Sequence, residues 1–484
     1  MKKEYDLIII GMGPSSIFCA LQLIKNGYDK KILIVEKGHR IEDRVCPIKK
    51  AGKCLKCKPV CSILGGFSGA GAFSDGKLLS YHLSSFNKNN DDIYIGGKSN
   101  SYIKDYYSKD EIIDYIKYVD QMYLDYGADS KIEGLDHLDE ISKYQQKAVK
   151  ENLNLIDVPI RHLGTEKSHD IFKKIEHELD NKVSLLFDTE VEDLLIKDNK
   201  IKGIKTKDDI FYSEQVVLAV GVNGSFWLEK LCKKYNINSR NGFIDIGIRY
   251  ELSDKTMEKI NKLLYEGKFI GYLPPYNDKV RTYCQNPSGF VTPETYDNGC
   301  SLVNGHSYKN KKSNNTNLAI LVSYKFDKPF NSTNEYGFNL ASKANLLSGG
   351  SAIMQRYGDF INGKITSPDD IKKNSVQPTY KEAYPFDLSY VLDYRTMVNL
   401  KNYISALGKI IDGFDNEDNI LYGPEIKFYG NEIELDKNFM TSVEGLYSIG
   451  TGGGLTIGLM MASVSGVMFA DKLIEMENRK WKKC

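Results

Sequence analysis

Four cysteines stand close together near the start of the chain, at a spacing that suits metal chemistry. They are Cys46, Cys54, Cys57 and Cys61, four of the nine cysteines in 484 residues. Tetrahedral zinc and iron–sulfur clusters both accept four thiolate ligands, and the spacing does not separate the two. Two plainer interpretations stay open, a redox-active pair at Cys54 and Cys57 or ordinary reduced cysteines on a lysine-rich loop. An odd cysteine count without an export signal makes a disulfide framework unexpected.

A glycine turn precedes these cysteines. Gly11 and Gly13 follow the apolar run 7–10, and Pro14 opens a helical pattern that continues to residue 26. In such a turn the first glycine permits the tight bend, and the second lets a pyrophosphate approach the positive end of the helix. Ser16 takes the third glycine position, where a small residue keeps most of the close packing.

A second strand, 31–35, ends at Glu36, whose carboxylate suits the hydroxyl groups of an adenosine ribose. The order strand, turn, helix, strand and acid predicts a Rossmann dinucleotide-binding unit. Two later segments, 215–221 and 445–466, again lead from a strand into glycines. A single NAD domain normally uses contiguous sequence, so the split arrangement favours FAD as the cofactor.

These patterns predict the α/β fold class. We expect a Rossmann-type FAD-binding domain with an inserted mixed α+β, largely antiparallel β substrate domain. Strand-like runs such as 243–251 and 318–326 alternate with polar turns in the inserted domain. We expect the FAD-binding domain at 1–82, 176–240 and 401–484, a helical insertion at 83–175, and the substrate domain at 241–400.

The order of motifs resembles an uncharacterised family of FAD-dependent dehydrogenases related to geranylgeranyl reductases, among the glutathione-reductase-2-like flavoproteins. The most specific match is the stretch 69–78, Gly-Ala-Gly-Ala-Phe-Ser-Asp-Gly-Lys-Leu. Shorter family-like segments are 245–249, 281–284, 303–307 and 421–425. Thr451 stands where relatives usually carry Asp or Glu for a ribityl hydroxyl, which would weaken FAD binding by about 1 kcal/mol.

The resemblance implies that Glu190 and Val191 lie near the adenine, the turn at Gly450 near the ribityl chain, and Gly458 with Leu459 beside the flavin. His306 and Cys284 are the catalytic candidates, for proton transfer and for facing the substrate. The complete set expected at the cofactor is Gly11, Gly13, Pro14, Ser15, Ser16, Glu36, Lys37, Arg44, Gly71, Lys77, Glu190, Val191, Gly221, Gly450, Thr451, Gly458 and Leu459.

Composition narrows the class of partner. A net charge of +1 gives no general attraction to nucleic acid, and no nucleic-acid partner is expected. The start of the chain does not suit a signal peptide, so a cytoplasmic protein is expected. The uncharged stretch 445–470 is rich in Gly, Ser and Thr, which favours strand, turn and helix over a transmembrane segment.

The leading hypothesis is an oxidoreductase in which FAD exchanges a hydride with a small-molecule or lipid-like substrate. A second Gly-x-Gly-x-x-Gly unit is not apparent, so electrons are expected from a carrier such as ferredoxin, from docked NAD(P)H or from the substrate. The resemblance suggests reduction of a carbon–carbon double bond, which is an analogy of fold. Two alternatives stay open, a redox sensor or electron-transfer module built on FAD and the cysteines, and a flavin-dependent step in RNA or secondary-metabolite modification.

Overall fold

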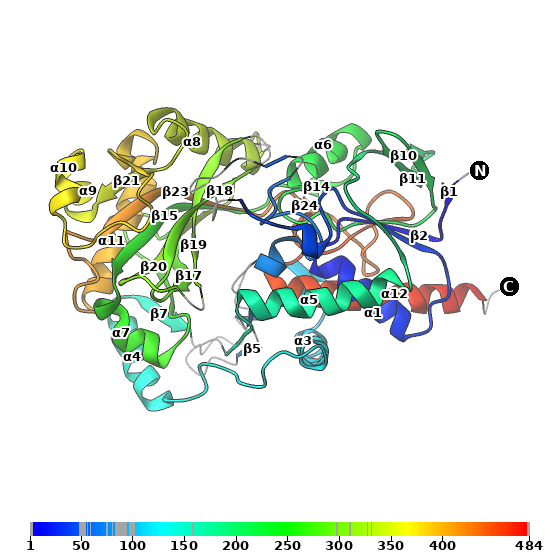
Figure 1. Ribbon diagram of the computed structural model, residues 1–484, viewed down its shortest axis with the longest axis horizontal. Helices are drawn as coiled ribbons and strands as arrows, with labels where there is room; N and C mark the ends of the chain where they lie inside the picture. Colours follow the sequence, from blue (N-terminus) through cyan, green and yellow to red (C-terminus); the bar gives the residue numbers. More distant parts are fainter. Residues whose placement is uncertain are drawn as a thin grey trace.

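The computed structural model divides the chain between two large sheets that lie side by side (Figure 1). Both chain termini lie at the outer end of the half with the parallel sheet. The structure describes residues 3–47, 55, 57–58, 60–73, 76–79, 81–82, 94–95, 102–156, 159–296, 299–308, 311–326, 328–330 and 332–481.

The first sheet has five parallel strands, which is the Rossmann arrangement that the sequence predicts. Its order is β25 (Leu446–Ser448), β13 (Val216–Leu218), β2 (Leu7–Ile10), β3 (Ile32–Val35) and β9 (Ser184–Leu186). Strands β2 and β3 are buried along their whole length, as expected for parallel strands covered on both faces. By pairing register, β13 and β25 lie 208 and 438 residues beyond β2 in the sequence and on one side of it in the sheet, so distant segments complete the sheet.

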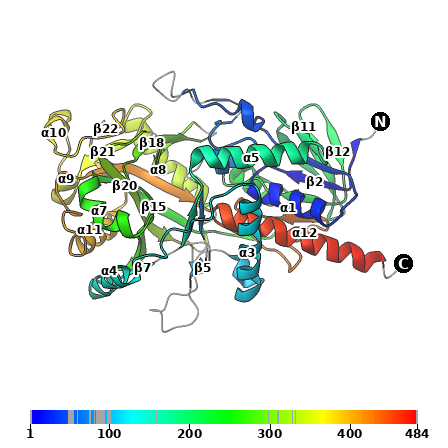
Figure 2. The same ribbon diagram turned by 60° about the horizontal axis from the view of Figure 1, so that its bottom comes forward.

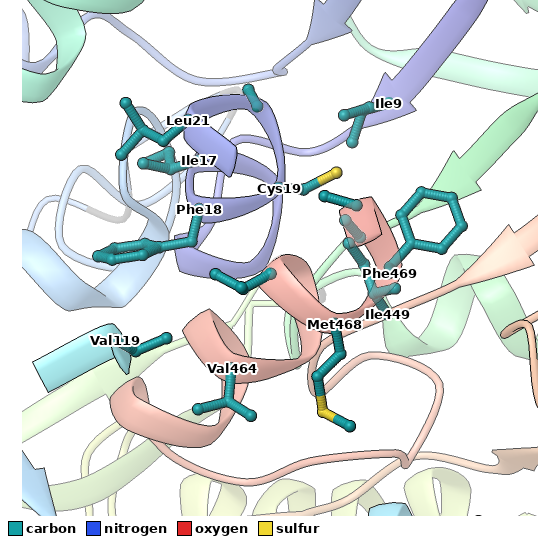
Figure 3. Packing of buried hydrophobic residues seen from close by; sticks show 14 of the residues in the cluster. Ile9, Ile17, Phe18, Cys19, Leu21, Val119, Ile449, Val464, Met468 and Phe469 are labelled. Atoms are coloured by element: carbon teal, nitrogen blue, oxygen red, sulfur yellow. The ribbon is translucent and has the colours of Figure 1, made fainter. Parts of the chain in front are cut away.

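Four helices pack beside this sheet. They are α1 (Pro14–Lys25), α3 (Lys109–Asp125), α5 (Thr165–Asp180) and α12 (Leu459–Trp481). Helices α1, α5 and α12 run side by side, and α3 crosses α12 (Figures 1 and 2). Figure 3 shows part of the apolar core around α1 and α12, to which α1 contributes Phe18 and Cys19, and α12 contributes Val464, Met468 and Phe469.

Gly466 sets the separation of α1 and α12. A methyl group at this position would lie well inside van der Waals distance of the Ser15 carbonyl oxygen. Gly466→Ala should therefore push the helices apart and lower the free energy of unfolding by about 1–3 kcal/mol, measured by denaturant titration. The exposed Glu475→Ala change on the same helix is the control and should have little effect. Equal stabilities would show that the helix contact can relax.

The second sheet has eight strands, antiparallel except at one edge pair. Its order is β22 (Tyr384–Pro385), β21 (Ile353–Arg356), β23 (Ile420–Phe428), β15 (Ile244–Ser253), β20 (Asn315–Tyr324), β17 (Lys279–Asn286), β16 (Lys268–Tyr272) and β7 (Leu153–Ile156).

One face of this sheet is apolar and covered by helices. Helices α7 (Asp254–Leu263), α8 (Thr333–Leu347) and α11 (Tyr394–Gly408) pack on it, on the side away from α1 and α12 (Figure 1). Because side chains alternate along a strand, the other face carries the charged residues of β15, β17 and β23. This charged face is the one that is not covered by those helices.

The remaining described elements are smaller. A four-stranded sheet is formed by β1 (Lys3–Glu4), β10 (Val191–Lys197), β11 (Lys200–Thr206) and β12 (Ile210–Tyr212). The strand pairs are β14 (Ser239–Arg240) with β24 (Glu432–Ile433), β18 (Phe290–Thr295) with β19 (Ser301–His306), β4 (Lys77–Leu79) with β8 (Ile160–His162), and β5 (Tyr81–His82) with β6 (Tyr94–Ile95). The other helices are α4 (Leu138–Lys150), α6 (Ser225–Tyr235), α9 (Tyr357–Asn362) and α10 (Pro368–Lys373). The 3₁₀ turns are η1 (Ile41–Asp43), η2 (Gly69–Phe73), η3 (Tyr102–Asp105) and η4 (Leu388–Tyr390).

The predicted domain limits place two strands outside the substrate domain, but both strands belong to its eight-stranded sheet. Strand β23 pairs between β15 and β21, so the eight-stranded sheet continues past the predicted limit at residue 400. Strand β7, within the region expected to be helical, forms the edge of the same sheet beside β16. Both corrections arise from pairing between distant segments, which local patterns do not reveal. We propose that the return to the parallel sheet begins after β23.

The uncharged stretch 445–470 forms β25, a glycine-rich turn and the first half of α12, as the sequence predicts. Among the described helices, none is long and apolar enough to span a membrane.

Candidate cofactor and substrate site

Three segments far apart in the sequence meet at the start of α1. The Ser68 amide donates to the Met12 carbonyl at 2.7 Å, which places the loop 65–73 over the glycine turn. A methyl group added at Gly71 would lie 3.2 Å from Leu459 Cδ1 and 3.4 Å from Pro14 Cγ. The structure therefore brings together the predicted residues Gly71, Pro14 and Leu459.

The two glycines of the turn differ in what they accommodate. Gly11 has φ +96°, and a side chain there would meet the Ala219 carbonyl oxygen. Gly13 has ordinary extended angles, φ −75° and ψ 177°, and a methyl group there would meet no atom of the described residues within 4 Å. No side chain caps this end of α1. Space beside Gly13 and an uncapped helix N-terminus fit a bound phosphate.

Glu36 closes the same site from β3. Its carboxylate accepts backbone hydrogen bonds from Met12 at 2.9 Å, Gly38 at 2.9 Å and Gly66 at 3.0 Å. A carboxylate offers about four acceptor positions, so one remains for a ribose hydroxyl. Glu36 thus organises the glycine turn in addition to its predicted contact with the nucleotide.

The glycine turn before α12 lies against the first one. A methyl group at Gly450 would lie 2.6 Å from Ser15 Oγ, and one at Gly452 would lie 2.7 Å from the Gly221 carbonyl oxygen. Among the described residues, the buried Thr456 hydroxyl in this turn has no hydrogen-bond partner, as expected of a group that binds a polar ligand. At both Gly221 and Gly458 a methyl group would meet no described protein atom within 4 Å. These open and unpartnered positions fit a dinucleotide that crosses from α1 to α12.

Other predicted cofactor residues have different surroundings. Arg44 donates to the carbonyls of Ser62, Ile63 and Phe67 and so ties the loop 62–67 together. Burial lowers the pKa of Arg44 to about 10. Further along, Val191 is buried at the start of β10, whereas Lys37 and Thr451 are half-buried and Glu190 is exposed.

Lys77 connects the two halves of the molecule. Its ammonium donates to Glu266 Oε2 at 3.1 Å and to the Gln285 carbonyl at 2.9 Å. Glu266 also accepts the Cys284 amide at 3.1 Å. Lys77 and Lys268 hold the pKa of the buried Glu266 carboxyl below its usual range against the opposing effect of burial. Lys77 therefore anchors β4, which begins within the 69–78 stretch, to β17 and to the segment before β16 of the eight-stranded sheet.

Cys284 occupies a strained position in β17. Its φ is +49°, in the left-handed region, where the pairing register with β20 shifts. Arg249 Nη1 and Asn286 Nδ2 both donate to its carbonyl at 2.8 Å. Such strain persists where surrounding contacts hold it and is concentrated at functional sites. Cys284 is half-buried beside Arg249, and its role as a substrate-facing residue stays a prediction.

His306, the other catalytic candidate, ends β19. It is half-buried, and its ring contacts Tyr308 edge-on with centroids 4.4 Å apart. The residue before it, Gly305, leaves no room for a side chain beside Arg249 and Asn317. His306 thus lies next to the polar network around Arg249, and its role in proton transfer stays a prediction.

Two buried ion pairs dominate the charged face, and they are its main unpredicted feature. Arg249 binds both oxygens of Glu425 at 2.7 Å, and Arg281 binds Asp245 at 2.5 Å. The Tyr429 hydroxyl donates to Asp245 at 2.5 Å and lies 2.7 Å from Arg281 Nη2. These charges lie within the family-like segments 245–249, 281–284 and 421–425, which could have indicated a shared site.

The metal prediction finds no support in the described residues. These include Cys46, Cys57 and Cys61 but not Cys54. Within them, no group of three or more His, Cys, Asp or Glu side chains could hold a metal ion. Outside these cysteines, His162 Nε2 lies 3.0 Å from the Tyr265 hydroxyl, within hydrogen-bond distance.

Part of the chain is similar to a described family. Residues 248–427 match the family "FAD-dependent protein, C-terminal domain-like". An uncharacterised protein of Clostridium beijerinckii is 27% identical and covers 97% of this chain and 80% of its own length.

Several solved structures share a weak overall likeness. L-proline dehydrogenase from P. horikoshii has 12% identity and a TM-score of 0.40, with 98% of this chain and 95% of that chain covered. Glycine oxidase from Bacillus cereus has 13% identity and a TM-score of 0.36, with 97% of each chain covered. A quinol–fumarate reductase has 12% identity and a TM-score of 0.47, with 98% of this chain and 71% of that chain covered.

The family match and the parallel sheet agree with the expected class, a FAD-dependent oxidoreductase. They show no relation to geranylgeranyl reductases.

Proposed function

We propose that this chain binds FAD across the glycine turns of α1 and α12 and exchanges a hydride with an organic substrate. The observation that carries the proposal is the convergence of Gly13, Gly221 and Gly458, each with open space, around Glu36 and the uncapped end of α1. The match of residues 248–427 to a FAD-dependent family supports the same cofactor.

The protein residues have distinct tasks in this proposal. The α1 N-terminus and Gly13 receive the pyrophosphate, Glu36 accepts a ribose hydroxyl, and the turn 450–458 follows the ribityl chain. Bound FAD supplies the hydride chemistry. The charged face of the eight-stranded sheet orients the substrate, with Lys77 fixing that sheet relative to the cofactor-binding half.

The finer proposals rest on the sequence patterns and the family resemblance alone. We propose reduction of a carbon–carbon double bond, with electrons from an external carrier such as ferredoxin or NAD(P)H. An iron–sulfur cluster or zinc at the four cysteines, and a cytoplasmic location, likewise stay proposals. The cysteines would supply single-electron transfer only if they hold iron.

Natively purified protein provides the test. We expect a yellow preparation that releases about one FAD per chain on heat denaturation, identified by mass spectrometry. Elemental analysis of the same sample reports iron or zinc. A colourless protein that also fails to take up added FAD would reject the proposed function.

A further inference from the structure

Lys268, the first residue of β16, is a buried cation that has no partner among the residues the structure describes. Its side chain is on the charged face, and only 3% of the residue is exposed. Among the described residues, no hydrogen-bond acceptor and no carboxylate within ion-pair distance faces its ammonium group. An isolated buried charge is costly, so a folded protein normally pairs it or removes its proton.

The carboxylates around Lys268 are bound to other cations, although Asp245 Oδ1 accepts no hydrogen bond from the described residues. Glu266 binds Lys77, and Asp245 binds Arg281 and Tyr429. Across the same face, Glu425 lies between Arg249 and Lys427, 3.1 Å from the latter. Each of these fully buried acids therefore has a cation of its own. A positive charge remains at Lys268 that no described side chain neutralises.

We propose that the substrate is a small organic anion and that the Lys268 ammonium binds its carboxylate or phosphate group. This inference rests on the proposed function, because it assigns the substrate class of the same site. It also explains why a costly cation persists in a sheet that could have held an apolar residue. The anion completes the ion pair that the protein leaves open.

The charged face is partly accessible near this lysine. Tyr283 and Lys427 are half-buried on that face, whereas the opposite face is sealed by apolar side chains. The Tyr283 ring stacks on Arg281, with the guanidinium carbon 4.9 Å from its centroid. A small anion at Lys268 would thus lie beside an aromatic side chain and a second cation, Arg281.

The protonation of Lys268 gives the proposal a pH dependence. Burial, Arg281 and Lys279 lower the pKa of Lys268 to about 7, while Glu266 and Asp245 act in the opposite direction. Anion binding needs the ammonium form, so binding should weaken about tenfold per pH unit above pH 7. In the unfolded chain the lysine pKa is about 10.4. The unfolded chain therefore binds the extra proton between about pH 7 and 10, and stability without ligand rises across that window.

The experiment titrates the purified protein with acetate and benzoate, with acetamide and benzamide as neutral matches and inorganic phosphate as a second anion. Binding is measured by the thermal midpoint and by the flavin absorption spectrum. We expect saturable binding of at least one anion and none of the amides. Lys268→Met should weaken that binding at least tenfold and remove its pH dependence. Lys262→Met, an exposed lysine paired with Glu258, is the matched control and should leave binding unchanged.

The outcomes separate the two proposals. Tighter binding of acetate or benzoate assigns a carboxylate, and tighter binding of phosphate assigns a phosphate ester. Equal affinity in wild type and Lys268→Met, or equal binding of amides and acids, would overturn the anion assignment even in a yellow protein. A protein without FAD would instead reject the proposed function, while the thermal midpoint still reports on Lys268. If Lys268→Met does not fold, the pH dependence of wild-type binding and stability decides the question.

Discussion

Gly13→Ala should give a folded protein that no longer retains FAD. The residue has φ −75° and ψ 177°, which alanine adopts without strain, and its added methyl group would meet no atom of the described residues within 4 Å. The methyl group would instead occupy the space in which the pyrophosphate approaches the backbone. We expect FAD affinity to fall on the order of 100-fold, about 2.7 kcal/mol. Released FAD per chain and equilibrium binding of added FAD measure the effect.

Gly11→Ala is the matched comparison, because the same substitution two residues earlier should reduce the stability of the fold and not the space for the cofactor. Gly11 needs its positive φ of +96°, and its new methyl group would lie 2.6 Å from the Ala219 carbonyl oxygen. We expect Gly11→Ala to lower the free energy of unfolding by about 1–3 kcal/mol. Gly13→Ala should leave the stability of the FAD-free protein unchanged. If Gly13→Ala binds FAD as wild type does, the phosphate is not at this turn.

The parts of the site that the sequence predicted are local or motif-based. Gly11, Gly13 and Glu36 lie within one strand–helix–strand unit, so their proximity follows from short-range geometry. The meeting of Gly71 with Pro14 and Leu459 was expected only through the resemblance. No periodicity of the chain specifies that a loop at 65–73 should cover α1.

The ion pairs of the charged face could not be predicted from local sequence patterns, for a physical reason. Arg249 and Glu425 are separated by 176 residues and meet because β23 pairs with β15. A charged residue within a strand pattern is predicted to face solvent unless its oppositely charged partner is known. The predicted domain limit at residue 400 has the same cause, because local patterns do not show that β23 pairs with β15. Lys268 could not be predicted, because an unpaired buried lysine has no sequence signature.

Arg249→Met should destabilise the protein more than any other change considered for this sheet. Both residues of the Arg249–Glu425 pair are fully buried, and the guanidinium also donates to the Cys284 carbonyl at 2.8 Å and to Asn304 Oδ1 at 2.9 Å. Removing it leaves Glu425 with Lys427 alone and leaves two acceptors without that donor. Breaking a buried pair in this way typically costs about 3–5 kcal/mol. Denaturant unfolding measures the free energy.

Arg395→Met is the control that isolates burial as the cause. Arg395 binds Asp278 with the same two-point geometry, at 2.6 Å for each contact, but its side chain is 51% exposed. Solvent screening limits such a pair to about 0–1 kcal/mol, so this variant should unfold almost as wild type does. The same substitution at two similar ion pairs thus tests whether the charged face is held by buried electrostatics. Comparable losses in both variants would show that burial is not what makes the Arg249–Glu425 pair important for stability.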